Sequence, residues 1–316
     1  MSQEHWENYY RGGALATAPM DGERGFDQEI AEAWESFFHV LPDSAVVLDI
    51  GTGNGIVLAF ASALARRLRR QWALYGTDLA QINPTQDVPS AHRLFSNCRF
   101  YPGVASENLP FEADAFDAVC GHYALEYSDI EVSVSELARV LKPGGVGQFI
   151  LHHTESELVT NARKSLATAD FLIGDIKIYQ RLRAFAEVAD ERARVGSPTT
   201  TGLRTAIQQA KEKLNDASGD YDRYLLAVVL DAVGHLLVSR PRDGMPYSLN
   251  EIARAESDLR SSVKRLRDLV SVAVSEAEIQ RLVLIAAQNS LVCEEPQHQI
   301  HGGKALVGWR LRFVAA

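Results

Sequence analysis

The residues best suited to chemistry form a glycine-rich turn directly after a predicted buried strand. The run V-V-L-D-I-G-T-G-N-G spans residues 46–55, and an apolar segment with helical spacing follows it. Glycines permit positive φ and let a ligand approach the backbone, and the next helix offers free N–H groups at its first turn. A dinucleotide-binding G-x-G-x-x-G turn would place a glycine where this chain has Ile56. The turn therefore indicates a nucleotide-type ligand, with a ligand-free tight turn as the alternative.

A carboxylate ends the next predicted strand, W-A-L-Y-G-T-D, as Asp78. In open parallel sheets, ligands bind outside the carboxyl ends of the strands. A side chain at that edge can accept two hydrogen bonds from a ribose diol. An Asp after a strand is often a helix cap. Its position after the glycine turn favours the ribose interpretation.

Three histidines follow later predicted strands. His122 ends F-D-A-V-C-G-H, and His152 and His153 end V-G-Q-F-I-L-H-H. A neutral imidazole titrates near physiological pH and can take a proton from an attacking hydroxyl. These three are therefore candidate catalytic bases, although the same rings could simply line a pocket or bind the backbone. No carboxylate–histidine spacing accompanies them, so no metal site is predicted.

Three further sequence motifs follow the glycine turn along the chain. They are G-V-A-S-E-N-L-P-F at 103–111, F-D-A-V-C-G-H-Y-A-L-E-Y at 116–127 and E-L-A-R-V-L-K-P-G-G at 136–145. Together with the glycine turn, they make the chain resemble the class I S-adenosylmethionine-dependent methyltransferases, especially the small-molecule branch. The resemblance covers about residues 40 to 153 and the terminal strands from about 275.

The resemblance implies an α/β fold: a doubly wound, mostly parallel, seven-stranded Rossmann-like sheet whose last strand is antiparallel. The cofactor, S-adenosyl-L-methionine, would lie across the carboxyl ends of the first strands. Its methionine part would contact the first strand and turn, at Asp49, Gly51, Thr52, Gly53 and Asn54. The remaining contacts would be Asp78 on the ribose, Leu79 on the adenine face, Ala105 and Ser106 at the adenine edge, and His122 beside the reacting methyl. Many relatives carry Asp where this chain has Val104, so Ser106 or Glu107 is expected to supply the adenine amino contact.

The elements that position these residues divide the chain into three parts. Residues 1–40 are expected to form an N-terminal helical cover, and residues 41–153 with 275–316 the methyltransferase domain. Residues 154–274 show almost no strand signal and are read as an all-helical insertion after the fifth strand, serving as a substrate lid or in dimerisation. Aromatic residues of the insertion would wall an organic substrate or form its own core; they are Phe171, Tyr179, Phe185, Tyr221, Tyr224 and Tyr247. Asp231 and His235, four apart on one helix face, could form a buried pair at the substrate or a polar pair within a helix interface.

The amino-acid composition of the chain limits the kinds of partner that it could bind. The 316 residues carry 32 Lys and Arg against 41 Asp and Glu, a net charge of −9, which argues against nucleic acid. The most apolar run, from Leu225 to Val238, is shorter than the about 20 residues of a membrane span, and no signal peptide is evident. We therefore expect a cytoplasmic enzyme, with no membrane partner, that moves a methyl group to a hydroxyl, carboxylate or nitrogen of a small metabolite. The alternative is a cofactor-binding protein without methyl transfer, whose insertion forms a homodimer.

Overall fold

The structure is a computed structural model that describes residues 4–13, 15, 28–89, 91–188, 196–216, 218–238 and 249–316. Part of the predicted N-terminal cover, and Tyr247, lie outside these residues. The chain divides into two compact units. The first comprises Met1–Val159 and Ser271–Ala316, and the second Thr160–Val270.

The first unit is built on a mixed sheet with eight strands among the described residues. The strands are β1 (Val46–Ile50), β2 (Ala73–Asp78), β3 (Cys98–Pro102), β4 (Phe116–His122), β5 (Leu141–Leu151), β6 (Leu291–Cys293), β7 (Gln297–His301) and β8 (Ala305–Ala315). The order is β3-β2-β1-β4-β5-β8-β6, with β7 also paired to β8. Strands β1 to β5 are parallel, whereas β8 is antiparallel to β5, β6 and β7. The strand order reverses between β1 and β4, which is where open α/β sheets form a ligand crevice.

The sheet has one strand more than the seven predicted. The additional strand is β7, with the sequence Q-H-Q-I-H. Its single apolar residue, Ile300, gives no apolar–polar alternation for a sequence pattern to detect. Backbone pairing with the long strand β8 holds it in place instead.

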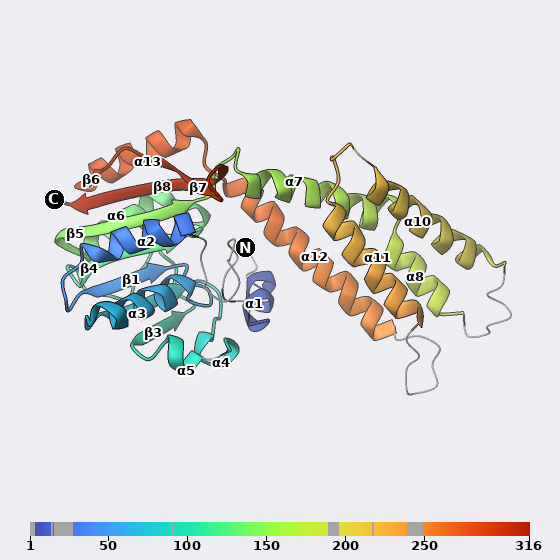
Figure 1. The fold of residues 1–316 in the computed structure, drawn as a ribbon, viewed down its shortest axis with the longest axis horizontal. Helices are drawn as coiled ribbons and strands as arrows, with labels where there is room; N and C mark the ends of the chain where they lie inside the picture. Colours follow the sequence, from blue (N-terminus) through green and yellow to red (C-terminus); the bar gives the residue numbers. More distant parts are fainter. Residues whose placement is uncertain are drawn as a thin grey trace. The chain divides into compact units, whose positions relative to one another are not determined.

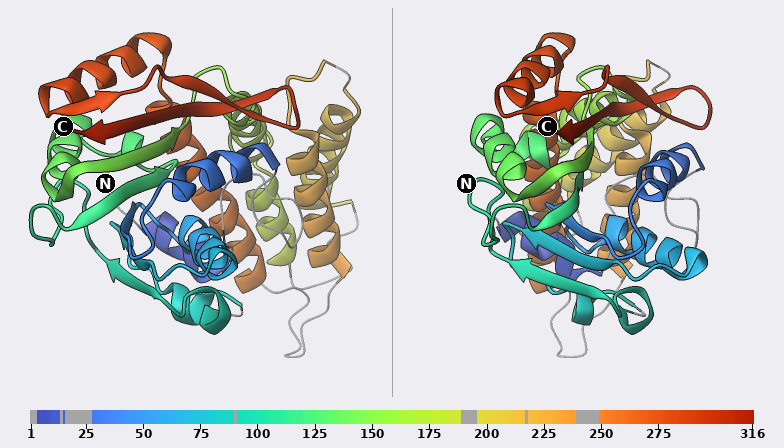
Figure 2. Two further views of the ribbon diagram at one scale, coloured as in Figure 1. Left: turned by 60° about the vertical axis from the view of Figure 1, so that its left-hand side comes forward. Right: turned by 90° about the vertical axis from the view of Figure 1, so that its left-hand side faces the viewer.

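Helices cover both faces of this sheet (Figures 1 and 2). The helices of the first unit are α1 (Glu4–Arg11), α2 (Gln28–His39), α3 (Ile56–Leu68), α4 (Pro84–Asp87), α5 (Ala91–Leu94), α6 (Ile130–Val140) and α13 (Glu276–Gln288). Helices α2 and α3 pack on one face, through Trp34, Phe38 and Leu58 among others. Helices α6 and α13 pack on the other, through Leu137 and Ile279. Apolar side chains alternate between the two faces along each strand, as they must in a sheet buried on both sides.

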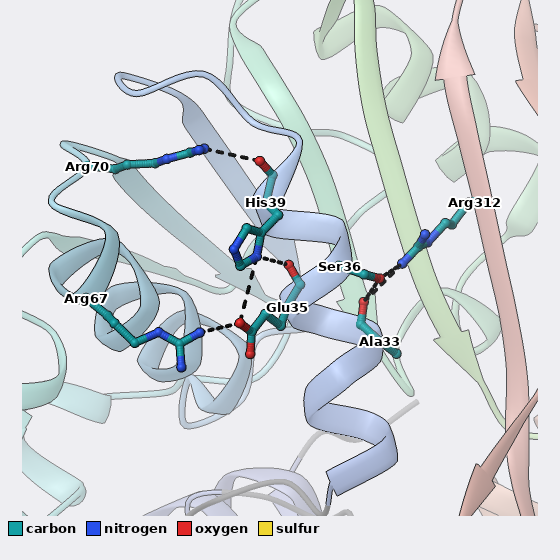
Figure 3. A network of polar contacts seen from close by, with 7 residues as sticks. All are labelled: Ala33, Glu35, Ser36, His39, Arg67, Arg70 and Arg312. Carbon is teal, nitrogen blue, oxygen red and sulfur yellow. Dashed lines mark hydrogen bonds and ion pairs between the residues drawn. The ribbon is translucent and has the colours of Figure 1, made fainter.

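Polar contacts fix α2 against its neighbours (Figure 3). Arg312 on β8 donates to the Ser36 hydroxyl and to the carbonyl oxygen of Ala33, the latter at 3.1 Å. Arg67 on α3 forms an ion pair with Glu35. The buried face of α2 is thereby held on the sheet beside the end of β4.

The second unit is helical throughout its described residues. Its helices are α7 (Glu157–Asp170, which begins in the first unit), a π-helical turn at Phe171–Asp175, α8 (Ile178–Ala186), α10 (Pro198–Asn215), α11 (Arg223–Val238) and α12 (Leu249–Val272, which ends in the first unit). They share a hydrophobic core of their own, centred on residues such as Leu172, Leu203 and Leu226. Four of the aromatic residues singled out from the sequence belong to this core or pack against it, namely Phe171, Tyr179, Phe185 and Tyr221.

Three side chains of α11 lie at the surface of the helical unit. Tyr224 is 80% exposed. Asp231 and His235 are also exposed, so neither alternative given for them, a buried pair at the substrate or a polar pair within a helix interface, is correct. The exposed face of α11 that carries Asp231 and His235 also carries the exposed apolar residues Val228 and Val238. Among the described residues, no helix combines the length and the apolar character needed to cross a membrane.

Candidate active site

The glycine turn between β1 and α3 adopts backbone angles that only glycine tolerates well. Gly51, Gly53 and Gly55 have φ of 56°, 51° and 82°, all in the left-handed region. A Cβ on Gly53 would lie 2.7 Å from the Tyr10 ring, and one on Gly51 would overlap the side chain of Ala124. The turn is therefore fixed both by its own backbone and by two close neighbours.

Asp49, at the end of β1, is buried beneath this turn. Its Oδ2 accepts a hydrogen bond from the Thr52 hydroxyl at 2.6 Å, and its Oδ1 one from the Cys120 thiol at 3.7 Å. Burial raises the pKa of Asp49 to about 7, although these two hydrogen bonds lower it. Asp49 and Thr52 thus support the turn from inside, and their predicted contact with the methionine part of a cofactor stays a prediction.

Asp78, at the end of β2, is joined directly to the glycine turn. Its Oδ2 accepts the N–H of Gly53 and its Oδ1 the N–H of Ala80, both at 2.8 Å. Burial raises the pKa of this carboxyl to about 6, although the two backbone hydrogen bonds lower it. A carboxylate has about four acceptor positions, so two remain for a ribose diol. The adjoining Leu79 is 49% exposed, an apolar surface suited to an adenine ring.

The residues predicted at the adenine edge are tied to the start of α6. The Ser106 and Ser133 hydroxyls lie 3.1 Å apart, and Glu107 accepts the N–H of Asp129, the helix N-cap, at 2.9 Å. Ala105 beside them is half-buried. These contacts give Ser106 and Glu107 a role in placing the loop, and their contact with adenine stays a prediction.

The L-P-F and E-L-A-R motifs hold the loop between β3 and β4. Arg139 donates to the carbonyl oxygens of Phe111 at 2.7 Å and Leu109 at 3.1 Å. It also pairs with Glu136 at 2.7 Å, and Glu136 accepts the N–H of Leu109 at 2.9 Å. These motif residues therefore act as a structural clamp beside the site.

Two of the three candidate histidines lie on the same face of the sheet. The His122 ring is 4.4 Å from the Tyr123 ring and 5.9 Å from Trp34 of α2. The His152 ring stacks on Tyr123 at 3.9 Å with an interplanar angle of 7°. Burial lowers the pKa of both imidazoles to about 3. They are neutral at physiological pH and only weakly basic.

His153 is separated from the other two. Its ring stacks on Trp309 at 4.6 Å, and its Nδ1 accepts the N–H of Glu155 at 2.9 Å. Successive residues of an extended chain point to opposite faces, which explains why His152 and His153 diverge. The structure therefore brings His122 and His152 together and leaves His153 elsewhere.

Glu126 is a candidate site residue that the sequence reasoning missed. It lies in a 3₁₀ turn, η2 (Leu125–Tyr127), just after β4, and is 6% exposed. Its Oε1 accepts the N–H of His152 at 2.8 Å. Its Oε2, and Nδ1 of His152, have no hydrogen-bond partner among the described residues. The detectable signal was a lone carboxylate within the run H-Y-A-L-E-Y at a strand end.

An aromatic row connects the glycine turn to this region. Tyr10 of α1 lies against Gly53, and its carbonyl oxygen accepts a hydrogen bond from Asn54 at 2.9 Å. Trp6 stacks on Tyr10 at 6.1 Å and meets Tyr127 edge-on at 5.7 Å. Helix α1 thus extends from the glycine turn to the turn that carries Glu126.

Comparison with known proteins agrees with this geometry. A family model described as "Methyltransferase domain" matches residues 47–145, the span from β1 to the start of β5. Residues 47–145 are therefore similar to a methyltransferase domain of the S-adenosylmethionine-dependent kind. An uncharacterized methyltransferase, YcgJ of Bacillus subtilis, is 32% identical over 121 residues, which are 36% of this chain and 43% of that protein.

Two other methyltransferases show weaker similarity. The 2-phytyl-1,4-naphtoquinone methyltransferase of Nostoc punctiforme is 28% identical over 154 residues, 48% of this chain and 64% of that protein. The solved structure of the Burkholderia thailandensis 1,6-didemethyltoxoflavin-N1-methyltransferase has 12% identity and a TM-score of 0.42, covering 90% of this chain and 78% of that one. The chain spans less than two thirds of the length of either curated relative.

The residues of this methyltransferase domain fit the adenosyl cofactor of its family. The glycines of the turn carry no side chains, so a ligand that displaced the Tyr10 ring could approach the backbone closely. Asp78 retains acceptor positions for the ribose, and Leu79 offers an exposed apolar surface. Among the described residues, no three His, Cys, Asp or Glu side chains are grouped as a metal ion would need.

Proposed function

We propose that the protein transfers the methyl group of S-adenosylmethionine to a hydroxyl, carboxylate or nitrogen of a small molecule. The observation that carries the proposal is the hydrogen bond between Asp78 and the N–H of Gly53. It joins the predicted ribose-binding carboxylate to the predicted cofactor turn, beside the point where the strand order reverses between β1 and β4.

The residues of the chain would act mainly by alignment. S-adenosylmethionine, when bound, supplies a methyl group on a positively charged sulfur that departs as a neutral thioether. Asp78 would hold the ribose hydroxyls, and the glycine turn would fix the methionine part. Trp6 and Tyr10 would exclude water and face the positive charge with aromatic rings. Placing the reactants in a near-attack arrangement can supply most of the rate enhancement.

A small organic acceptor is the substrate class that we propose. The net charge of −9 opposes a polyanionic acceptor such as nucleic acid. The Nostoc relative is named as a 2-phytyl-1,4-naphtoquinone methyltransferase, and we carry over from it only the size class of the acceptor.

The helical unit is proposed as a lid over the acceptor, with dimerisation as its other proposed role. The chain leaves and re-enters the first unit at neighbouring points. The N–H of Val274 donates to the carbonyl oxygen of His152 at 2.8 Å, and that of Thr154 to the carbonyl oxygen of Val274 at 3.2 Å. Both connections therefore start beside the carboxyl end of β5, where an acceptor would bind.

A methyl-transfer assay tests the proposed function. Purified protein would be incubated with S-adenosylmethionine carrying a labelled methyl group and with pools of small hydroxyl, carboxylate and amine compounds. Label in an organic product supports the proposal. Cofactor binding with no labelled product from any pool would favour a binding protein instead.

A further inference from the structure

We infer that Glu126 is the proton acceptor of the methyl transfer, so that the reacting atom of the acceptor carries a hydrogen, as a hydroxyl or an N–H group. The inference rests on the proposed function. It narrows the acceptor chemistry and assigns the base to a residue outside the three histidines.

The geometry of Glu126 leaves one oxygen ready for a ligand. The N–H of His152 fixes Oε1 at 2.8 Å, so the carboxyl group has a defined orientation. Oε2 is buried and has no hydrogen-bond partner among the described residues. Buried polar atoms are nearly always paired in folded proteins, and one left unpaired calls for a ligand or water. A hydroxyl or N–H donor on the acceptor would satisfy Oε2.

The turn that carries Glu126 lies close to the glycine turn. It follows β4 directly, and β4 lies beside β1, which carries the glycine turn. Its neighbour Tyr127 contacts Trp6, which stacks on Tyr10 over Gly53. The same aromatic row therefore borders both the glycine turn and the turn that carries Glu126.

The histidines are less suited to the task. His153 already accepts a backbone N–H at Nδ1 and stacks on Trp309. Burial lowers the pKa of His122 and His152 to about 3, so neither holds a proton well near neutral pH. The same burial raises the pKa of Glu126 to about 7. A base is most effective when its pKa lies near the working pH.

Among the described residues, no positively charged side chain lowers the pKa of Glu126 back toward its ordinary value. Its carboxyl group accepts the N–H of His152, which directly follows β5, and the backbone N–H groups of Ala124 and Glu126 also lower its pKa. The charge of Glu126, together with burial, raises the pKa of the Tyr123 phenol. The nearby imidazoles of His122 and His152 are neutral. Tyr127 follows Glu126 in the same turn.

With a hydroxyl acceptor, the reaction moves one methyl group to the acceptor oxygen and one proton to Glu126. The acceptor oxygen uses a lone pair to bond the methyl carbon while the carbon–sulfur bond breaks, and sulfur keeps that electron pair. The proton of the hydroxyl moves to Oε2 of Glu126 and then to solvent after the product leaves. A carboxylate acceptor has no such proton, and it would bring a second negative charge against Glu126.

Glu126→Gln tests the inference, since it keeps an oxygen for the His152 N–H and removes the base. The matched control is Glu131→Gln, an exposed glutamate on α6 that pairs with Arg281. Infrared difference spectra of the whole protein should show a protonated carboxyl at about pH 5 that ionises at about pH 7. Burial also raises the pKa of Asp49 to about 7 and that of Asp78 to about 6, so Glu126 accounts only for the part of this signal that is lost in Glu126→Gln and kept in the control. A Glu126 already ionised at about pH 5 would overturn the inference, and this measurement needs no acceptor.

Kinetics with an acceptor found in the labelled pools completes the test. Glu126→Gln should lower kcat by about 100-fold or more, abolish the rise of rate with pH, and leave the affinity for S-adenosylhomocysteine unchanged. Turnover and pH profile equal to wild type would overturn the inference. If the wild-type protein binds no S-adenosylhomocysteine, the proposed function fails, whereas the infrared titration still reports on Glu126 separately.

Discussion

Replacing Glu126 with Gln should change how the stability of the protein depends on pH. Burial raises the pKa of Glu126 to about 7 in the folded state, from its ordinary value of 4.5. The folded protein therefore holds this proton more tightly than the unfolded chain does. The stabilisation that this bound proton gives to the folded state is complete below about pH 4.5. It is lost as the pH rises through about 7.

The size of the effect follows from the shift of the pKa. Between about pH 5 and pH 8, the wild-type protein should lose about 2–3 kcal/mol of unfolding free energy that Glu126→Gln does not lose. Asp49, Asp78 and the buried histidines titrate in both proteins, so their contributions cancel in the comparison.

Urea denaturation at the two pH values measures this difference. Glu131→Gln, which alters an exposed carboxylate, should follow the wild-type pH dependence. If the stability difference between wild type and Glu126→Gln is the same at both pH values, the folded-state pKa of Glu126 is ordinary and the reasoning about its burial is refuted.

Three further predictions concern the turn, the clamp and the helical unit. Gly53→Ala should weaken S-adenosylhomocysteine binding at least about 30-fold by calorimetry, since its Cβ would meet the Tyr10 ring at a φ of 51°. Arg139→Ala should lower the unfolding free energy by about 1–3 kcal/mol in urea denaturation, because two loop carbonyls lose a charged donor. Hydrogen exchange over residues 160–270 should slow when cofactor and acceptor are both bound, and protection unaffected by ligands would refute the lid.

Local patterns predicted the parallel part of the sheet because each strand there is a short apolar run followed by a helix. The glycine turn and Asp78 were predicted from their places after β1 and β2, and the Gly53–Asp78 hydrogen bond confirms that they lie together. The polar strand β7 was missed, since pairing with β8 and not its own residue pattern keeps it extended.

The proton-transfer chemistry was harder to predict because burial decides it. His152 and His153 are adjacent in sequence, yet one stacks on Tyr123 and the other on Trp309. A sequence pattern indicates that a histidine follows a strand, but not which face its ring occupies. The orientation of the Glu126 carboxyl group also depends on long-range structure, because its hydrogen-bond donor, the N–H of His152, lies 26 residues away in the sequence.

The central claim is that the glycine turn and Asp78 bind an adenosyl cofactor, and calorimetric titration with S-adenosylhomocysteine tests it most directly. Wild-type protein should bind with micromolar affinity and should not bind NADH. Asp78→Ala should weaken binding by about 1.5–3 kcal/mol, or about 10- to 150-fold, as expected for hydrogen bonds to a charged group. Absence of binding to the wild-type protein, or equal affinity in Asp78→Ala, would contradict the account.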